Sequence, residues 1–323
     1  MQGRTREKLA ELAGRECYDS LGRGRSSFDY HQHILEVGHF SVYEHCQFTL
    51  LAKNAALRAD ALLELLNRPG LFVKPTTQGH LRVTMNLRTV LDWEKFGDKN
   101  AAPLSLLLIA RELFPQVFAK RVQMGRPNCS LDAFVSETLD PVYDEEKWVT
   151  LRMTGSRGFS HELVRHGDFT AISQRSTRYV DESEGEWCLH PLVNKLCGAD
   201  ENFPFADKVR TFIEASRGLY RDTVALGSTE LGALGIDKTT SRKQARGAAR
   251  GFLGNALGTS VIFSASVAQW RWILGLRAHP AADAEIRESA AAALKVLKTS
   301  RYGDRFADMI LAPSPDGFGE VLD

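Results

Sequence analysis

The feature that most constrains the fold is a series of amphipathic helical patterns interrupted by a few short apolar strand patterns. The longest pattern, residues 203–227, keeps apolar side chains at the 3.6-residue spacing of a helix with one buried face. Strand patterns cover 46–53 and 147–156, and 80–93 reads as a strand that runs into a helix. We therefore predict an α+β protein in which helices surround one central, mostly antiparallel sheet. The other helical patterns are 4–22, 26–38 (with Ser27 as its N-cap), 56–70, 102–122, 160–167, 241–254, 266–278 and 281–298, and an irregular tail is expected at 312–323.

Charge and cysteine content exclude several classes of protein. The net charge is only +1, from 41 basic and 40 acidic residues, whereas general nucleic-acid or anionic-membrane binders carry a larger basic excess. No apolar run reaches the roughly 18 residues of a membrane span, and the charged N-terminus lacks a signal-peptide pattern. An odd number of cysteines without C-x-x-C spacing argues against a disulfide framework and against a zinc site. We expect a cytoplasmic protein without metal, whose cysteines are Cys17, Cys46, Cys129, Cys188 and Cys197.

The stretch RHGDFTAISQRSTRY, residues 165–179, concentrates arginine and hydroxyl groups. Guanidinium groups suit bidentate recognition of phosphate, and the amide of Gln174 is able to read the edge of a base. A solvated charged surface would explain the arginines alone. It would not explain Gln174 and Ser176 between them, next to the aromatic Tyr179. A phosphorylated small molecule with a polar ring fits better. Two later arginines, Arg250 and Arg277, belong either to this site or to a solvated helix surface.

A second polar element, HFSVYEH at residues 39–45, precedes a strand. Its two histidines lack the i, i+4 spacing of a helical zinc site, so the remaining alternatives are a polar turn and a ligand-contacting loop. Cys46 is a weak candidate nucleophile because it begins an apolar strand. The sequence contains no G-x-S-x-G elbow, no P-loop and no G-x-G-x-x-G motif.

Taken together, these elements resemble the flavin-dependent thymidylate synthase family. RHGDFTAISQRSTRY is similar to its R-H-R, seven residues, Ser signature ending in R-Y, but Gly167 replaces the second arginine and eight residues precede Ser176. GHFSVYEHCQFTL, RGAARGFL and ILGLRAHPAADAEIRESA are similar to three further motifs of that family, in the same order. The resemblance covers 27–51 and 149–298. It implies a single domain over 1–323 with a large, helical insertion at about 52–148.

The resemblance also implies an activity. Members transfer a one-carbon unit from 5,10-methylenetetrahydrofolate to C5 of a uridylate, with FAD reduced by NADPH and without an enzyme cysteine attacking the ring. They are homotetramers with sites shared between subunits. Arg277 and Ser176 match catalytic positions, with Arg277 facing the uracil. The substrate-binding positions are Glu162, Arg165, Gln174, Ser176, Arg178, Arg250 and Arg277, with Arg250 supplied by a neighbouring subunit, and the cofactor-binding positions are Ser41, Glu44, Arg165, His166 and Gln174.

Several positions depart from the family pattern. Glu162 stands where a Gln is usual, and Gly247 and Gly254 replace a Glu and a Pro. The N-x-R triplet is lost, with Ser266 and Ala268 in its place. The insertion contains a similar triplet at Asn86 and Arg88, and we hypothesise that these two residues supply the missing flavin or folate contacts.

So many changes around the nucleotide favour an altered substrate. We expect UMP, and dUMP as well, to be methylated, as by the UMP C5-methylases of polyoxin-type nucleoside antibiotic biosynthesis. The alternative within the family is an ordinary enzyme acting on dUMP only. The alternatives outside this activity are a flavin-free RNA-binding protein and an inactive family member.

Overall fold

Two separate antiparallel sheets form the centre of the molecule, and helices cover them. The computed structural model describes residues 2–22, 24–52, 71–96, 110–119, 137–167, 170–199 and 202–323. Sheet A has four strands in the order β2-β3-β1-β4, and sheet B has three in the order β5-β7-β6. The strands of these sheets are β1 (Gln47–Ala52), β2 (Phe72–Pro75), β3 (Leu81–Asn86), β4 (Glu137–Leu139), β5 (Trp148–Ser156), β6 (Thr170–Gln174) and β7 (Gly258–Ser266).

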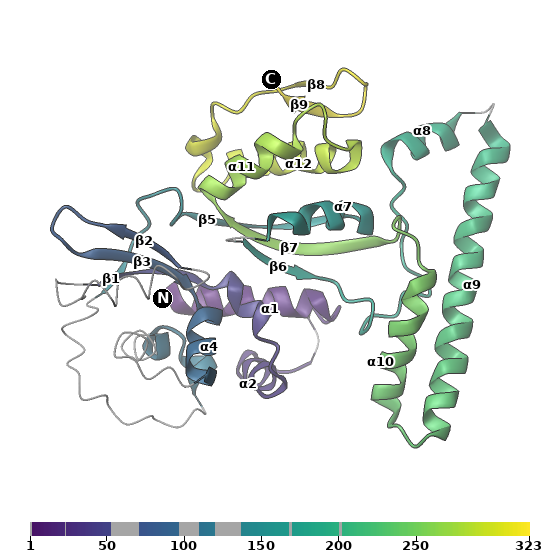
Figure 1. The fold of residues 1–323 in the computed structure, drawn as a ribbon, viewed down its shortest axis with the longest axis horizontal. Coiled ribbons are helices and arrows are strands. Elements are labelled where there is room, and N and C mark those ends of the chain that lie inside the picture. Colours follow the sequence, from purple (N-terminus) through teal and green to yellow (C-terminus); the bar gives the residue numbers. More distant parts are fainter. Residues whose placement is uncertain are drawn as a thin grey trace.

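Sheet B is covered on both faces, which explains why all of β7 except its first residue is buried. Figure 1 shows α7, α11 and α12 above this sheet and α1 below it. Phe263 packs edge-to-face on Trp270 at 5.1 Å, and Phe159 and Leu294 join the same core. The helices involved are α1 (Gln2–Cys17), α7 (Arg157–Leu163), α11 (Val267–Arg277) and α12 (Ala284–Lys298).

Sheet A has a core of its own, formed with short helical segments from the first third of the chain. Phe48 of β1 packs against Phe114, and Met85 and Val90 are fully buried beside them. The segment at 39–45, for which a polar turn or a ligand-contacting loop was expected, forms a 3-10 helix over Phe40–His45 with mostly buried side chains. The elements around this core are α2 (Ser27–Val37), η1 (Phe40–His45), α4 (Leu87–Phe96) and α6 (Pro115–Phe118).

A long helical hairpin lies to one side of sheet B, at the right of Figure 1. Its first helix is α9 (Phe203–Ala233), and α10 (Lys238–Ala249) packs antiparallel along it. Asp237 caps α10 by accepting hydrogen bonds from two backbone N–H groups. The remaining short elements are η3 (Val164–His166), α8 (Pro191–Gly198), η5 (Arg250–Phe252), η6 (Gly303–Phe306), β8 (Leu311–Pro313) and β9 (Glu320–Leu322).

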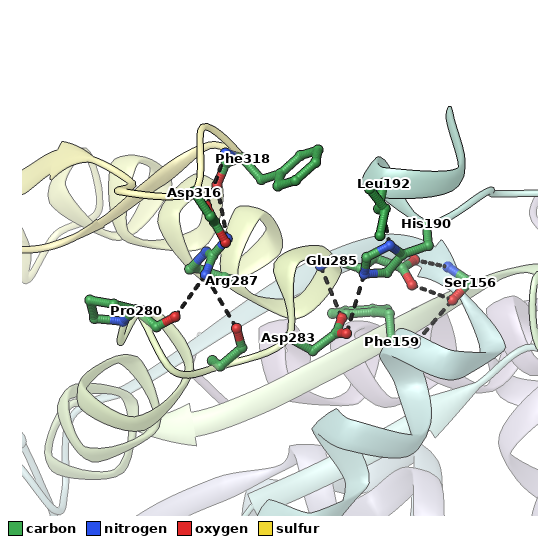
Figure 2. Close-up of polar contacts among 11 residues, drawn as sticks. Ser156, Phe159, His190, Leu192, Pro280, Asp283, Glu285, Arg287, Asp316 and Phe318 are labelled. Carbon is green, nitrogen blue, oxygen red and sulfur yellow. Dashed lines mark hydrogen bonds and ion pairs between the residues drawn. The ribbon is translucent and has the colours of Figure 1, made fainter. Parts of the chain in front are cut away.

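The start of α12 ties distant segments together, as Figure 2 shows. Glu285 accepts hydrogen bonds from the backbone N and hydroxyl of Ser156, at 2.8 and 2.6 Å, which joins α12 to the end of β5. Arg287, 1% exposed, donates to the carbonyls of Pro280 and Phe318 and pairs with Asp316 at 2.5 Å. The buried guanidinium therefore holds the C-terminal segment against the core.

The α+β class and the antiparallel pairing are confirmed. The expectation of one compact sheet was wrong, because β1 pairs with β3 and β4 from the segment 52–148 instead of joining sheet B. That segment contains strands as well as helices among its described residues, and the predicted helix at 56–70 lies outside them. The C-terminal tail forms the β8–β9 hairpin, and Ser26 rather than Ser27 caps α2. None of the helices in the described ranges is both long and apolar enough to cross a membrane.

Candidate active site

A pocket of about 260 Å³ lies where η1 and the end of α1 meet β6. The two polar elements singled out in the sequence, 39–45 and 165–179, therefore come together in space. Aromatic rings form part of its wall: Tyr18 meets Tyr179 edge-to-face at 4.7 Å, and its hydroxyl bonds to His39 Nδ1 at 3.0 Å. An aromatic wall with a few polar groups suits a flat polar ring. The lining residues are Cys17, Tyr18, His39, Ser41, Ile172, Ser173, Gln174, Ser176 and Tyr179.

A chain of hydrogen bonds runs from the pocket wall into the space between the sheets. His45 bonds to Ser173 through Nε2 at 3.0 Å and to Ser264 through Nδ1 at 2.7 Å, and Ser264 bonds to Thr150 at 2.7 Å. Burial lowers the pKa of His45 to about 3, so the ring is neutral at physiological pH. One ring nitrogen then donates and the other accepts, which hydroxyl partners can satisfy. This arrangement uses both nitrogens and argues against His45 as a metal ligand.

Hydrogen bonds to their neighbours fix Gln174 and Ser176, and each side chain keeps one acceptor or donor that a ligand could use. The Gln174 amide nitrogen donates to the hydroxyls of Ser160 at 2.9 Å and Thr259 at 3.3 Å, so its Oε1 remains as an acceptor. The backbone N–H of Ser176 donates to the carbonyl of Cys17 at 3.0 Å, which fixes this end of β6 against α1. The Ser176 hydroxyl accepts from the backbone N–H of Arg178, so its own proton is available to a ligand oxygen.

A second cluster forms around Arg277, at the end of α11. Its guanidinium donates to Glu162 Oε2 at 2.7 Å, to the Glu162 carbonyl at 3.3 Å and to His166 Nε2 at 2.8 Å. Because His166 accepts this bond, its ring must be neutral. Burial and the neighbouring Arg277 both lower the pKa of His166, in agreement. Arg165 pairs with Glu162 at 3.2 Å but is 67% exposed. The cluster thus brings four predicted residues together, outside the pocket lining.

One ring nitrogen of His166 is left without a partner among the described residues. Its Nδ1 is buried and, among the described residues, has no hydrogen-bond partner. The ring is held edge-to-face by Trp272 at 5.1 Å between centroids. An unpaired buried N–H is costly and marks a place where a bound group would be stabilised.

The two remaining arginines predicted for the site, Arg178 and Arg250, belong neither to the pocket lining nor to the cluster around Arg277. Arg178 and Arg250 are exposed and form no ion pair within the described ranges. Gly247 of α10 faces Arg178, since a Cβ placed there would lie 3.9 Å from Arg178 Nε. Arg250 lies close enough to Arg157 to lower the pKa of that guanidinium, second to burial. Both side chains are therefore available to an anionic ligand or to another subunit.

Asn86 and Arg88, which were expected to contact flavin or folate, have different roles in the structure. Asn86 Oδ1 accepts from the backbone N–H and the hydroxyl of Thr89, at 2.8 and 3.0 Å, so Asn86 caps α4. Arg88 pairs with Asp92 at 2.6 Å and lies 3.9 Å from Glu44. Burial raises the pKa of Glu44, and Arg88 opposes that rise. The Arg88 guanidinium lies 5.8 Å from the centre of the ring of Phe40, the residue after the pocket-lining His39. Burial lowers the pKa of His39, and Arg88 lowers it further.

Sequence reasoning missed the contribution of α1. Cys17 and Tyr18 line the pocket, yet in the sequence they belong to an ordinary amphipathic helical pattern, and in the structure Cys17 is the last residue of α1. Burial raises the pKa of Cys17 to about 11, so this thiol is not a nucleophile at neutral pH. The packing of α1 beneath sheet B places these residues at the site, and no local motif announces it.

Part of the chain is similar in sequence to known proteins. Residues 145–300 match the family model described as thymidylate synthase complementing protein, Thy1. The chain is 34% identical over 179 residues to a flavin-dependent thymidylate synthase of Mycobacterium sp. (strain KMS), which covers 54% of this chain and 66% of that relative. The enzyme of Mycobacteroides abscessus is 33% identical over 174 residues, with the same coverage, and that of Corynebacterium glutamicum is 34% identical over 155 residues. The chain thus spans just under two thirds of the length of the first two relatives, and about half of it is similar to these flavin-dependent thymidylate synthases.

Proposed function

We propose that this chain is a member of the flavin-dependent thymidylate synthase family that methylates C5 of a uridylate, UMP and also dUMP, with 5,10-methylenetetrahydrofolate, FAD and NADPH. The observation that carries the proposal is the meeting of η1 and β6 at one ring-sized, aromatic-walled pocket. Cys17 lines the pocket with a raised pKa and Cys46 is fully buried, which fits chemistry without a cysteine nucleophile.

The residues present fit one ring system of a flavin or a nucleotide, but not the whole of either molecule. A pocket of about 260 Å³ is smaller than the roughly 300–1,000 Å³ of most small-molecule sites, so it takes one ring system and not a whole dinucleotide. Ser41 and Glu44 on η1, and Arg165 and His166 on η3, would hold the cofactor. When bound, the reduced flavin would supply a hydride and the folate a one-carbon unit.

The chain's own groups would orient and polarise the uridylate. The free Oε1 of Gln174 would accept the imide N–H of the uracil ring, and the Ser176 hydroxyl would donate to a ligand oxygen. Arg277, fixed by two partners, would stabilise negative charge on the ring without reorganising. The exposed guanidinium groups of Arg178 and Arg250 suit the phosphate.

Arg178, Arg250 and the cluster around Arg277 lie outside the pocket lining, and we propose that a second chain completes the site. Helix α9 supplies a surface for that. Its Phe205, Phe212, Leu219 and Leu226 recur every seven residues and are 39–68% exposed. A seven-residue apolar stripe is typical of helix–helix association. We propose a homotetramer, and light scattering should report four times 35.9 kDa. Replacing Leu219 and Leu226 by Asp should lower that mass.

The remaining parts of the proposal concern location and substrate choice. Within the described residues Cys17, Cys46, Cys188 and Cys197 are free thiols, which fits a reducing cytoplasm. We favour UMP because the chain departs from the usual pattern at Gly167 and in the spacing before Ser176. Gly167 has ordinary right-handed helical angles, and a Cβ there would meet only the Val164 carbonyl at 3.5 Å. Its backbone therefore does not require glycine, so space for a ligand is the reason we assign to it.

The test compares turnover of UMP and dUMP at equal concentrations by the purified protein. Turnover of UMP supports the proposal, and turnover of dUMP alone would replace it by an ordinary thymidylate synthase. A colourless protein that binds RNA with a steep salt dependence would instead indicate an RNA-binding function. The variant Arg277→Lys keeps the charge but loses the forked hydrogen bonds and should reduce turnover at least tenfold, about 1.4 kcal/mol.

A further inference from the structure

The two sheets repeat one arrangement of strands. In sheet A, β1, β2 and β3 pair antiparallel in the spatial order β1-β3-β2. In sheet B, β5, β6 and β7 pair antiparallel in the order β5-β7-β6. In each case the third strand lies between the first two and runs directly into a helix, α4 or α11.

The register repeats as well. Gln47 pairs with Asn86 at the end of one central strand, and Trp148 pairs with Ser266 at the end of the other. Two residues further along each first strand lies a pair of facing hydroxyls. Thr49 and Thr84 are joined at 2.8 Å between their hydroxyl oxygens, and Thr150 and Ser264 at 2.7 Å.

The junction between the central strand and its helix is built in the same way twice. Asn86 Oδ1 accepts from the backbone N–H three residues later, at 2.8 Å, and Ser266 Oγ does so at 3.1 Å. In each copy the residue after this cap donates a backbone hydrogen bond to the residue that precedes the first strand. Leu87 N–H donates to the Cys46 carbonyl at 3.0 Å, and Val267 N–H donates to the Lys147 carbonyl at 2.7 Å.

A sequence trace accompanies these contacts. Val-Tyr-Glu at 42–44 corresponds to Val-Tyr-Asp at 142–144, and Thr-Leu at 49–50 corresponds to Thr-Leu at 150–151. The turn after each tyrosine is closed by the same bond, from the N–H three residues later to the tyrosine carbonyl, at 3.1 and 3.0 Å. One additional residue in the second segment accounts for the change of offset from 100 to 101.

Contacts between the two segments are reciprocal. His45, two residues before β1, bonds to Ser264 of β7 in the other sheet. Glu146, two residues before β5, binds Arg82 of β3 in the other sheet through two bonds of 2.7 and 2.8 Å. By register Ser264 corresponds to Thr84 and Arg82 to Ile262, so the two contacts reach the same strand of the other unit at positions two residues apart. An exchange between matching strands is typical of a two-fold symmetric interface.

We propose that residues 42–52 with 71–92 (the first copy) and residues 142–156, 170–174 and 258–273 (the second copy) are two copies of one unit, paired inside one chain as two subunits would pair. This pairing creates two equivalent junctions. One is at the pocket, where His45 of the first copy bonds to Ser173 of β6 in the second copy; His39 and Ser41, just before the first copy, line the pocket beside this contact. Arg88 then occupies the position in the first copy that Ala268 occupies in the second.

The other junction is filled by protein. There the turn at 142–146 meets β2, the equivalent of β6. Glu146, whose side chain is fully buried, also accepts from the backbone N–H of Val142 at 2.8 Å. The Lys74 ammonium lies 3.7 Å from the centre of the Tyr143 ring. Where the pocket has small hydroxyl groups, this junction has a buried ion pair and a stacked cation. Each chain therefore has one open junction for ligand.

Cysteine pairs test the equivalence without any ligand. Facing positions on antiparallel strands lie close enough for a disulfide, whereas a shift of one residue turns one side chain to the opposite face. We expect Thr49→Cys/Thr84→Cys and Thr150→Cys/Ser264→Cys both to oxidise, by mass spectrometry of unreduced peptides. The shifted controls Thr49→Cys/Met85→Cys and Thr150→Cys/Ala265→Cys should stay reduced. Oxidation of only one facing pair would overturn the proposal.

Loss of the Ser264 hydroxyl removes a partner of His45, so a second set keeps Ser264 and instead removes the helix-capping side chain, Asn86 or Ser266, in both copies alike. Gln47→Cys/Asn86→Cys and Trp148→Cys/Ser266→Cys occupy equivalent positions at the ends of the same strands. They should behave alike, and a difference between them would count against equivalence in the same way.

Titration of the full chain with FAD tests whether the second junction is closed. FAD is chosen as the probe because of the proposed function, and the rest of the inference does not depend on that function. Calorimetric saturation at one FAD per chain is expected. Saturation at two would overturn the closed second junction. A chain that binds no FAD would contradict the proposed function, and the cysteine pairs would still decide whether the two copies are equivalent.

Discussion

Replacement of Glu162 by Gln isolates the charge that holds Arg277. The carboxylate lies 2.7 Å from Arg277 and 3.2 Å from Arg165, and the introduced amide would keep a neutral acceptor in nearly the same place. The side chains of Glu162 and Arg277 are 27% and 18% exposed, so solvent screens the pair only in part. Arg165 is 67% exposed and contributes little.

The magnitude follows from this partial burial. A hydrogen bond to a charged group contributes about 1.5–3 kcal/mol, and the amide retains part of it. We expect Glu162→Gln to lower the free energy of unfolding by about 1–2 kcal/mol, or the melting temperature by about 2–4 °C. Removing a neighbouring negative charge should also strengthen the attraction of Arg277 for an electron-rich uracil, by about 1 kcal/mol or fivefold in Kd.

Thermal unfolding and uridylate titration of the same preparation give both quantities. Glu36→Gln is the matched control, because Glu36 is exposed and forms no ion pair among the described residues. If the two variants melt at the same temperature and bind uridylate equally, the Glu162–Arg277 pair does not hold the arginine in solution.

Three further perturbations follow from the geometry. Gly247→Glu places a carboxylate beside Arg178 and should weaken uridylate binding about tenfold, about 1.4 kcal/mol, whereas Gly247→Ala should not; equal losses would contradict this. Burial raises the pKa of Glu182 from 4.5 to about 6, so its contribution to stability is present below pH 4.5 and is lost as pH rises through 6. Relative to Glu182→Gln, the wild type should lose about 2 kcal/mol over that range in urea unfolding, and a pH-independent difference would refute it. Arg287→Ala removes a buried cation, should cost about 3–5 kcal/mol and should expose residues 311–323 to protease; an unchanged melting temperature would exclude this role.

Much of the fold was predictable because its periodic signals are local. The helical pattern at 203–227 and the strand pattern at 147–156 correspond to α9 and β5. The existence of two sheets was not predictable in the same way. The pairing of β1 with β3 rather than with β5 depends on contacts between residues far apart in the sequence, which no local pattern reveals.

The candidate site was likewise predictable only where the sequence carries a local signal. Gln174 and Ser176 were singled out from their polar neighbours and Ser41 from the family resemblance, and all three line one pocket. Asn86 looked like a ligand residue, but its side chain caps a helix, which any Asn before a helix can do. Tyr18 carried no signal at all, because an aromatic residue after a helix is equally compatible with core packing.

The central claim is that this chain transfers a one-carbon unit to C5 of a uridylate. The most direct measurement is an anaerobic reaction of the reduced protein with UMP or dUMP and 5,10-methylenetetrahydrofolate labelled in its methylene carbon, followed by mass analysis of the nucleotide. We expect labelled 5-methyl-UMP from UMP and a labelled methylated product from dUMP. Recovery of both nucleotides without label would contradict the account.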